Sequence, residues 1–330
     1  MTQAQDSGID RREFLSRSVK AAAAVAATGA AAWLLRDSRG PAAQEPRASV
    51  SLADYSIPAL AGKMAIVTGA GRKMTVNRAL EALGGIGQFV KRGDRVLLKV
   101  NAAFATPPAL SATTNPQLVA EVARLCLQGA GAASVVVTDN PINDAASCFA
   151  LSGIEQAARS AGAKVVLPRE QAFSPTTVPG GRLIVNWPIL HEPFIGITKV
   201  IGMAPVKHHE RSGASMAMKN WYGLLGGRRN VFHQDIHNII KELAEMVRAT
   251  LVILDGTTTM MRNGPTGGSL DDLAATNTMI VSTDQVAADA FGATLLGKTA
   301  ADLPFIQLAE AAGRGTADYE SLKPIRLHVD

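Results

Sequence analysis

Residues 95–101 read Arg-Val-Leu-Leu-Lys-Val-Asn, and residues 134–139 read Ser-Val-Val-Val-Thr-Asp. Each stretch is a short apolar run that ends on polar residues, and Asn115-Pro116 opens a helix between them, with a capping-type side chain before a proline in the first turn. Short strands joined by helices of ten or more residues build a layered, largely parallel sheet. This part of the chain therefore predicts an α/β fold.

The same alternation continues on both sides of residues 95–139. Further strands are expected at 64–68, 164–167, 198–205, 250–255 and 279–282, and further helices at 76–90, 144–161, 235–247 and 285–296. Residues 176–187 alternate around Pro179-Gly180-Gly181, which predicts a hairpin. We expect a mixed, largely parallel sheet with flanking helices and an appended hairpin.

The N-terminal residues 10–16, Asp-Arg-Arg-Glu-Phe-Leu-Ser, resemble the consensus of a twin-arginine export signal. The Ala-rich segment 21–35 that follows suits a signal peptide but is shorter than the roughly 20 residues that span a bilayer. The alternative is an Ala-rich soluble helix. The signal predicts recognition by the twin-arginine translocation machinery and a periplasmic or otherwise exported protein, held at the membrane only through this segment if it is not cleaved.

The predicted organisation is a signal peptide at 1–43, a linker rich in Ala, Ser and Pro at 44–62, and a single α/β domain at 63–330, which two intertwined lobes could also form. The chain carries 33 Lys and Arg against 28 Asp and Glu, with no basic block after the signal, so we expect no nucleic-acid partner. Cys126 and Cys148 are the only cysteines, too few to ligate an ordinary iron–sulfur cluster.

Polar side chains end several of the predicted strands, at the edge where open α/β sheets bind ligands. Each residue alone is as well explained by a helix cap or a turn. Together they predict a shared cleft. The residues are Lys99, Asn101, Asp139, Lys207, His209 and Asp255.

The segment 207–237 is the richest in chemically active side chains and holds four of the six histidines. Lys207 and Lys219 suit a carboxylate or phosphate, because cationic donors favour anions. His233 and His237 are four residues apart, which on one helical turn would let both reach a divalent metal ion. Alternatively, His233 caps the following helix and His237 is half-buried.

Two further features suit an anion, each with a simple alternative. Residues 264–268, Gly-Pro-Thr-Gly-Gly, could bring the backbone amides of Gly267 and Gly268 to a ligand, but a surface turn would look the same. Arg228 and Arg229 could bind an anion or form solvated surface charge.

A set of short motifs recurs in order along nearly the whole chain after the signal. They are Lys99-x-Asn101, Thr113-Thr-Asn-Pro116, Asp139, Pro205-Val-Lys207-x-His209, Lys219-Asn220-x-x-Gly223, His233, Asp255-Gly256 and Gly264-Pro265-x-Gly267-Gly268. This set resembles the family catalogued as domain of unknown function 362, which implies a fold more than a reaction. Many members of that family carry a ferredoxin-like module with cysteine clusters, which this sequence lacks. The order Lys219, Gly223, His233 is also similar, by analogy only, to nickel-pincer lactate racemases.

The leading hypothesis is an exported protein that binds a small anionic ligand, with or without a divalent metal, in a Lys/His/Asp cleft, and that acts on this ligand as an enzyme. The expected catalytic residues are His209, His233 and Lys219; the ligand-binding residues are Lys99, Asn101, Lys207, Asn220, Gly267 and Gly268; and the metal ligands are His233, His237, Asp139 and Asp255. The alternatives are a non-catalytic periplasmic binding or metal-handling protein, and a structural partner protein whose polar residues are scattered.

Overall fold

The computed structural model describes residues 10–34 and 48–330. The chain divides into two units, Met1–Arg47 and Ala48–Asp330. The first contains the helical segment described next. The second contains the sheet and all of the residues predicted to form the cleft.

Arg11 and Arg12 open helix α1, which runs from Arg11 to Leu34. Its side chains from residue 11 to residue 30 are exposed. No helix in the two described ranges has both the length and the apolar character that a membrane span requires. The end of the predicted signal peptide, at residue 43, lies outside the described residues.

Ten strands form one sheet in the second unit. They are β1 Met64–Thr68, β2 Arg95–Lys99, β3 Ser134–Thr138, β4 Lys164–Val165, β7 Lys199–His209, β8 Gly213–Ser215, β9 Leu251–Met260, β10 Leu273–Ala274, β11 Thr278–Ser282 and β12 Ile325–His328. Their order is β12-β1-β11-β9-β7-β2-β3-β4, with β8 paired to β7 and β10 paired to β9. β11 runs antiparallel to β1 and β9, β8 and β10 are also antiparallel to their partners, and the other ladders are parallel. The predicted mixed, largely parallel sheet is confirmed.

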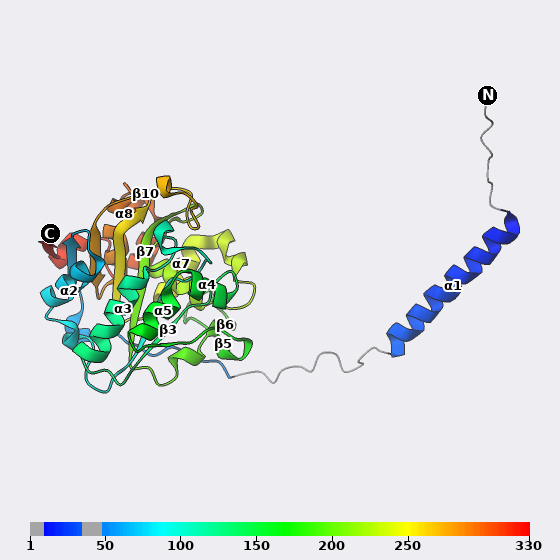
Figure 1. Ribbon diagram of the computed structural model, residues 1–330, viewed down its shortest axis with the longest axis horizontal. Helices are drawn as coiled ribbons and strands as arrows, with labels where there is room; N and C mark the ends of the chain where they lie inside the picture. Colours follow the sequence, from blue (N-terminus) through cyan, green and yellow to red (C-terminus); the bar gives the residue numbers. More distant parts are fainter. Residues whose placement is uncertain (1–9, 35–47) are drawn as a thin grey trace, which may run out of the picture. The chain divides into compact units, whose positions relative to one another are not determined.

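Helices cover both faces of this sheet (Figure 1). They are α2 Arg72–Ala82, α3 Pro116–Arg124, α4 Ala145–Leu151, α5 Ile154–Ser160, α6 Ala217–Asn220, α7 Ile236–Met246, α8 Gln285–Leu295 and α9 Pro304–Ala311. Successive strand residues point to opposite faces. Thus Val96 and Leu98 pack with α2 to α5, whereas Leu97 packs with α6 to α9. Burial on both faces explains the continuous apolar runs of these strands.

Two predicted helices have different limits in the structure. The helix expected at 76–90 ends at Ala82, because Gly84 and Gly85 follow with φ angles of 96° and 85°. The helix expected at 144–161 is split into α4 and α5 by Gly153, whose φ angle is 71°. Glycine adopts such left-handed conformations without steric cost and interrupts a helix there.

The predicted hairpin forms a separate two-stranded sheet of β5 Phe173–Thr176 and β6 Trp187–Leu190. Residues 177–186 connect the strands as a long loop rather than a tight turn. The buried carboxylate of Glu242 on α7 holds this loop by accepting the backbone N–H groups of Arg182, Leu183 and Ile184 at 2.7–3.1 Å.

Residues 48–62, the described part of the predicted linker 44–62, belong to the second unit and pack on the rest of it. The backbone N–H of Val50 donates to the carbonyl of Pro175 at 2.8 Å, and Tyr55 is buried in the core. Ala, Ser and Pro indicate the lack of regular structure, not the lack of contacts. Tyr55 was the signal that this segment packs, because an aromatic side chain gains much from burial.

Glu242→Ala removes the acceptor of three backbone N–H groups. We expect the free energy of unfolding in urea to fall by about 2–4 kcal/mol, because a buried unpaired donor costs about 1–3 kcal/mol, and trypsin to cleave faster at the exposed Arg182. Glu245→Ala on the same helix is the control, since Glu245 only pairs with Lys241, at 3.1 Å. Equal stability of the two variants would contradict the assigned role of Glu242.

Candidate functional site

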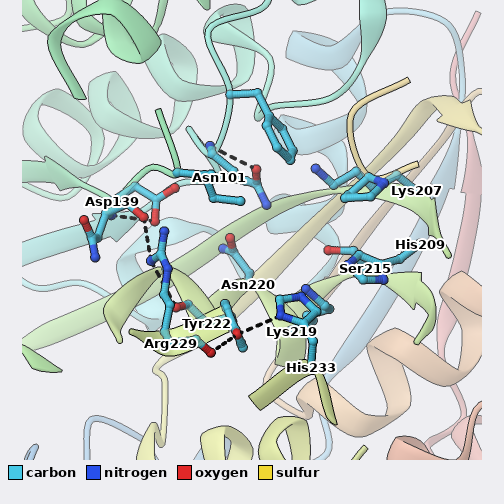
Figure 2. Close-up of a pocket in the computed structure, with 16 residues that line it drawn as sticks. Asn101, Asp139, Lys207, His209, Ser215, Lys219, Asn220, Tyr222, Arg229 and His233 are labelled. Carbon is cyan, nitrogen blue, oxygen red and sulfur yellow. Dashed lines mark hydrogen bonds between the residues drawn. The ribbon is translucent and has the colours of Figure 1, made fainter. Parts of the chain in front are cut away.

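A cavity of about 80 Å³ lies beyond the carboxyl ends of β2 and β3, beside the end of β7 (Figure 2). Its polar lining residues are Asn101, Asp139, Asn140, Lys207, His209, Ser215, Lys219, Asn220, Tyr222, Arg229 and His233. The structure thus brings together most of the residues that the sequence placed in a shared cleft. Lys99, Asp255, His237, Gly267 and Gly268 do not line it.

Two cavity residues lie on the last part of β7, beyond the end that was predicted for this strand. It continues past Pro205 to His209 by pairing with β8, and its register shifts between Pro205 and Lys207. Lys207 and His209 are two residues apart and reach the cavity from the same side of the strand. His208 between them accepts the N–H of Gly264 at 3.2 Å, which holds the neighbouring Pro265 at the cavity wall.

Lys99 and Asp139 form a buried ion pair behind the cavity, with 2.7 Å between Nζ and Oδ1. Lys99 also donates to the carbonyls of Val100 and Asn220, at 2.7 and 2.8 Å. The second carboxylate oxygen of Asp139 accepts the N–H of Ala102 at 2.6 Å. Lys99 therefore has no donor left for a ligand, and it positions Asn220 and Asp139 rather than binding the ligand as predicted.

Gly223 is required by this ion pair. A Cβ atom at Gly223 would lie 2.0 Å from Oδ1 of Asp139 and 2.9 Å from Nζ of Lys99. Both distances are too short for any side chain. The spacing Lys219-Asn220-x-x-Gly223 thus combines two cavity residues with a close backbone approach to the ion pair.

Lys207 and Lys219 are buried, and neither forms a salt bridge with any residue that the structure describes. Lys207 donates to the carbonyl of Ala112 and lies 5.2 Å from the centre of the Phe104 ring. Lys219 lies 4.8 Å from the centre of the Tyr222 ring. Burial lowers the pKa of both lysines to about 7, and the charge of Lys219 contributes to the shift at Lys207. Two amines without counter-ions make the cavity attractive to an anion.

A buried carboxylate holds the start of helix α6, which carries Lys219 and Asn220. Asp289 on α8 accepts the N–H groups of Ala217 and Met218 at 2.7 and 3.1 Å. Burial raises the pKa of Asp289 to about 7. The backbone hydrogen bonds fix the start of α6 and thereby the direction of both cavity side chains.

His209 and His233 stack with 5.9 Å between ring centres and an angle of 10° between the rings. Burial, followed by the charge of Lys219, lowers the pKa of His209 to about 2 and also lowers the pKa of His233. Both rings are therefore neutral at neutral pH. They offer hydrogen-bonding groups to a ligand, not positive charge.

Tyr222 and Ser215 were missing from the predicted site. Arg229 had been interpreted as an anion ligand or as surface charge. It instead donates to the carbonyls of Asn140 and Pro141, both at 2.8 Å, and joins two loops of the cavity wall. Both Tyr222 and Ser215 lie inside the dense segment 207–237, which was a usable signal, but the residue type of Ser215 does not set it apart from other serines.

The four predicted metal ligands do not come together. Asp255 is bound by Arg72, at 2.6 Å, and His237 stacks on Phe305 of α9. The residues before α7 form a 3₁₀ helix that ends at Asp235, so His233 and His237 do not lie on one regular α-helical turn. Within residues 10–34 and 48–330, no group of three or more His, Cys, Asp or Glu side chains could hold a metal ion.

The loop at 264–268 contributes Pro265 to the cavity wall, not the two glycines that were predicted to bind ligand. Gly267 and Gly268 have φ angles of 64° and 154°, so they serve the turn itself.

A wider groove of about 500 Å³ adjoins the cavity. Both are lined by Asn140, Ile142, Tyr222, Arg229 and His233, so these residues stand at the opening between them.

The fold and this cleft define an α/β protein with a cationic pocket at the strand ends. Residues 96–294 match the model of the family described as a domain of unknown function, DUF362, and the chain belongs to this family. The resemblance seen in the sequence motifs is thereby confirmed.

Two proteins of known name are similar to this chain. A thylakoid-associated protein of Synechocystis sp. is 28% identical over 261 residues, which cover 74% of this chain and 76% of that protein. The lactate racemase apoprotein from Thermoanaerobacterium thermosaccharolyticum has a TM-score of 0.41 and 14% identity, with 74% of this chain and 58% of the racemase chain covered. A similarity at this level transfers no residue role.

Gly223→Ala tests the close approach to the buried ion pair. We expect the free energy of unfolding to fall by about 3–5 kcal/mol, because separating a buried pair leaves charges without compensation. Gly87→Ala is the matched control: this glycine is exposed, and no atom lies within 4 Å of an added Cβ. Urea unfolding of both variants measures the difference, and a loss no larger for Gly223→Ala than for the control would refute the constraint.

Proposed function

We propose that this chain is exported through the twin-arginine pathway and binds a small anion, a carboxylate or a phosphate, in the cavity between β7 and α6. The observation that carries this proposal is the pair of buried lysines, Lys207 and Lys219, without salt-bridge partners among the described residues. Burying an ammonium group is costly unless an anion compensates it. A bound oxyanion would supply that compensation.

The size and the other side chains of the cavity support a small oxyanion. A volume of about 80 Å³ accommodates a few water-sized groups. Asn101 and Ser215 add neutral hydrogen-bonding groups around the two lysines. Asn220, which was predicted to bind the ligand, instead donates its side-chain N–H groups to the carbonyls of Lys99 and Met203, at 3.2 and 3.1 Å. Such a lining suits a carboxylate or phosphate group better than an extended apolar ligand.

Two observations support export. The motif at residues 10–16 pairs Arg11 and Arg12 with Phe14-Leu15 ahead of an Ala-rich helix. The relative from Synechocystis sp. is thylakoid-associated, which favours a location at or beyond a membrane for this chain as well.

Catalysis is the second part of the proposal, with non-catalytic binding as its rival. The neutral His233 ring at the opening of the cavity favours catalysis, since a neutral imidazole can accept a proton from a bound ligand. Asp139 and His233 are the predicted metal ligands that line the cavity, but the Asp139 oxygens already accept from Lys99, Ala102 and Asn140, so the proposal includes no divalent metal. Metal and small-molecule analysis of protein purified after native export, together with Lys219→Ala and His233→Ala, separates the two: lost binding without any turnover favours the binding protein.

Lys207→Met and Lys219→Met are each expected to weaken binding of inorganic phosphate about ten-fold or more, because each removes a charge-assisted hydrogen bond. The exposed Lys164→Met is the control and should bind as the unmodified protein does. Isothermal titration calorimetry measures the dissociation constants.

The same titration has a defined pH dependence. Because the lysine pKa values lie near 7, the charged amines are lost as the pH rises through this value, and phosphate binding should weaken from about pH 6 to about pH 9 even though phosphate itself gains charge. Affinity that increases with pH would count against the lysines as the binding groups.

Arg11→Lys combined with Arg12→Lys keeps the charge of the signal but removes the arginine pair. We expect the chain to accumulate in the cytoplasm, because the pair is the recognition element of the proposed pathway. Arg17→Lys, on the same helix, is the control and should be exported normally. Cell fractionation with immunodetection measures the distribution, and unchanged export of the double variant would exclude this pathway.

A further inference from the structure

The proton of His209 is fixed by the backbone around it. Its Nδ1 atom accepts the N–H groups of Arg211 and Ser212, both at 3.2 Å. Backbone N–H groups only donate, so Nδ1 carries no hydrogen. The neutral ring must then carry its hydrogen on Nε2. His209 presents a hydrogen-bond donor to the cavity and has no free lone pair.

His233 has the opposite arrangement. Its Nδ1 atom lies 3.3 Å from the carbonyl of Asn230 and 3.1 Å from the hydroxyl of Tyr222. A carbonyl only accepts, and the hydroxyl hydrogen of Tyr222 is already donated to the carbonyl of Arg229. Nδ1 of His233 therefore carries the hydrogen, and Nε2 keeps its lone pair.

The lone pair of His233 stands in a lining that otherwise mostly donates. Figure 2 shows Lys207, Lys219 and His209 in the lining with His233. The two lysines are donors, and the inferred N–H of the stacked His209 ring is a third. The oxygens of Asp139 already accept from Lys99, Ala102 and Asn140, at 2.7, 2.6 and 2.9 Å. A bound anion thus meets several donors, whereas Nε2 of His233 can only accept a hydrogen from it. The hydroxyl of Ser215 and the side-chain amides of Asn101 and Asn140, which also line the cavity, can each donate as well as accept.

We propose that the cavity selects protic oxyanions, which carry a hydrogen on one of their oxygens, over aprotic ones of the same size and charge. His233 accepts the hydrogen of the ligand, while His209 and the two lysines donate to its other oxygens. An aprotic anion would set an oxygen lone pair against that of Nε2 and leave this atom desolvated without a partner. Hydrogen phosphate is the simplest anion that satisfies the arrangement. This selectivity rests on the proposed anion binding and specifies the chemistry of the anion.

Phosphate and sulfate provide the test, because they match in size and shape, but sulfate carries no hydrogen at neutral pH. Sulfate also has at least as much charge, so a purely electrostatic cavity would bind it equally well or better. Calorimetric titration near neutral pH should show about ten-fold or more tighter binding of phosphate. His233→Ala should reduce this ratio to nearly one. His209→Ala should weaken binding of both anions and keep the preference.

The two ring forms can be measured without any ligand. In protein labelled with ¹⁵N-histidine, nitrogen chemical shifts should show the hydrogen on Nε2 of His209 and on Nδ1 of His233. The same form for both rings would overturn the inference, even if the variants proved too unstable to titrate. Equal binding of phosphate and sulfate would overturn the selectivity alone. Failure of both anions to bind would overturn the proposed function and the selectivity with it.

Discussion

The buried ion pair between Lys99 and Asp139 is the constraint on which the cleft depends. It joins the ends of β2 and β3, and through the carbonyl of Asn220 it also fixes α6. Two charges removed from water are tolerated only when every lone pair and hydrogen finds a partner. Here the backbone supplies those partners, and the need for close approach excludes a side chain at Gly223. The ion pair thus determines both the position of the cavity and the sequence around it.

The three buried lysines differ because their neighbours differ. Lys99 has a carboxylate at 2.7 Å, whereas Lys207 and Lys219 meet carbonyl or aromatic groups. The carboxylate of Asp289, which holds the start of α6, is occupied by backbone N–H groups. The fold therefore neutralises one lysine internally and leaves the other two without a carboxylate partner among the described residues. The proposed binding of an anion would supply the missing negative charge.

The fold could be predicted from the sequence because each strand is marked by residues within it and next to it. Strands such as 95–99 are buried on both faces, so each appears as an uninterrupted apolar run, and polar residues mark where it ends. The different roles of Lys99 and Lys207 could not be predicted, because both follow similar runs and differ only in tertiary partners. Asp255 was misplaced for the same reason: β9 continues to Met260, so this carboxylate lies within the strand and meets Arg72. The change of helix type at Asp235 likewise has no local signal.

The pairing of β1 with β11 also limits when β1 can enter the sheet during synthesis of the chain. Met64 lies opposite Ser282, so the first strand of the domain waits for a partner until nearly all of the sheet has been synthesised. Until then, β1 is an apolar strand without pairing partners on either edge. Unpaired apolar strands of this kind aggregate readily and are bound by chaperones. Long-range closure of this kind also slows folding. β1 can therefore join the sheet only after residues 278–282 have been synthesised, whereas β2, β3 and β7, at whose ends the cavity lies, are complete by residue 209.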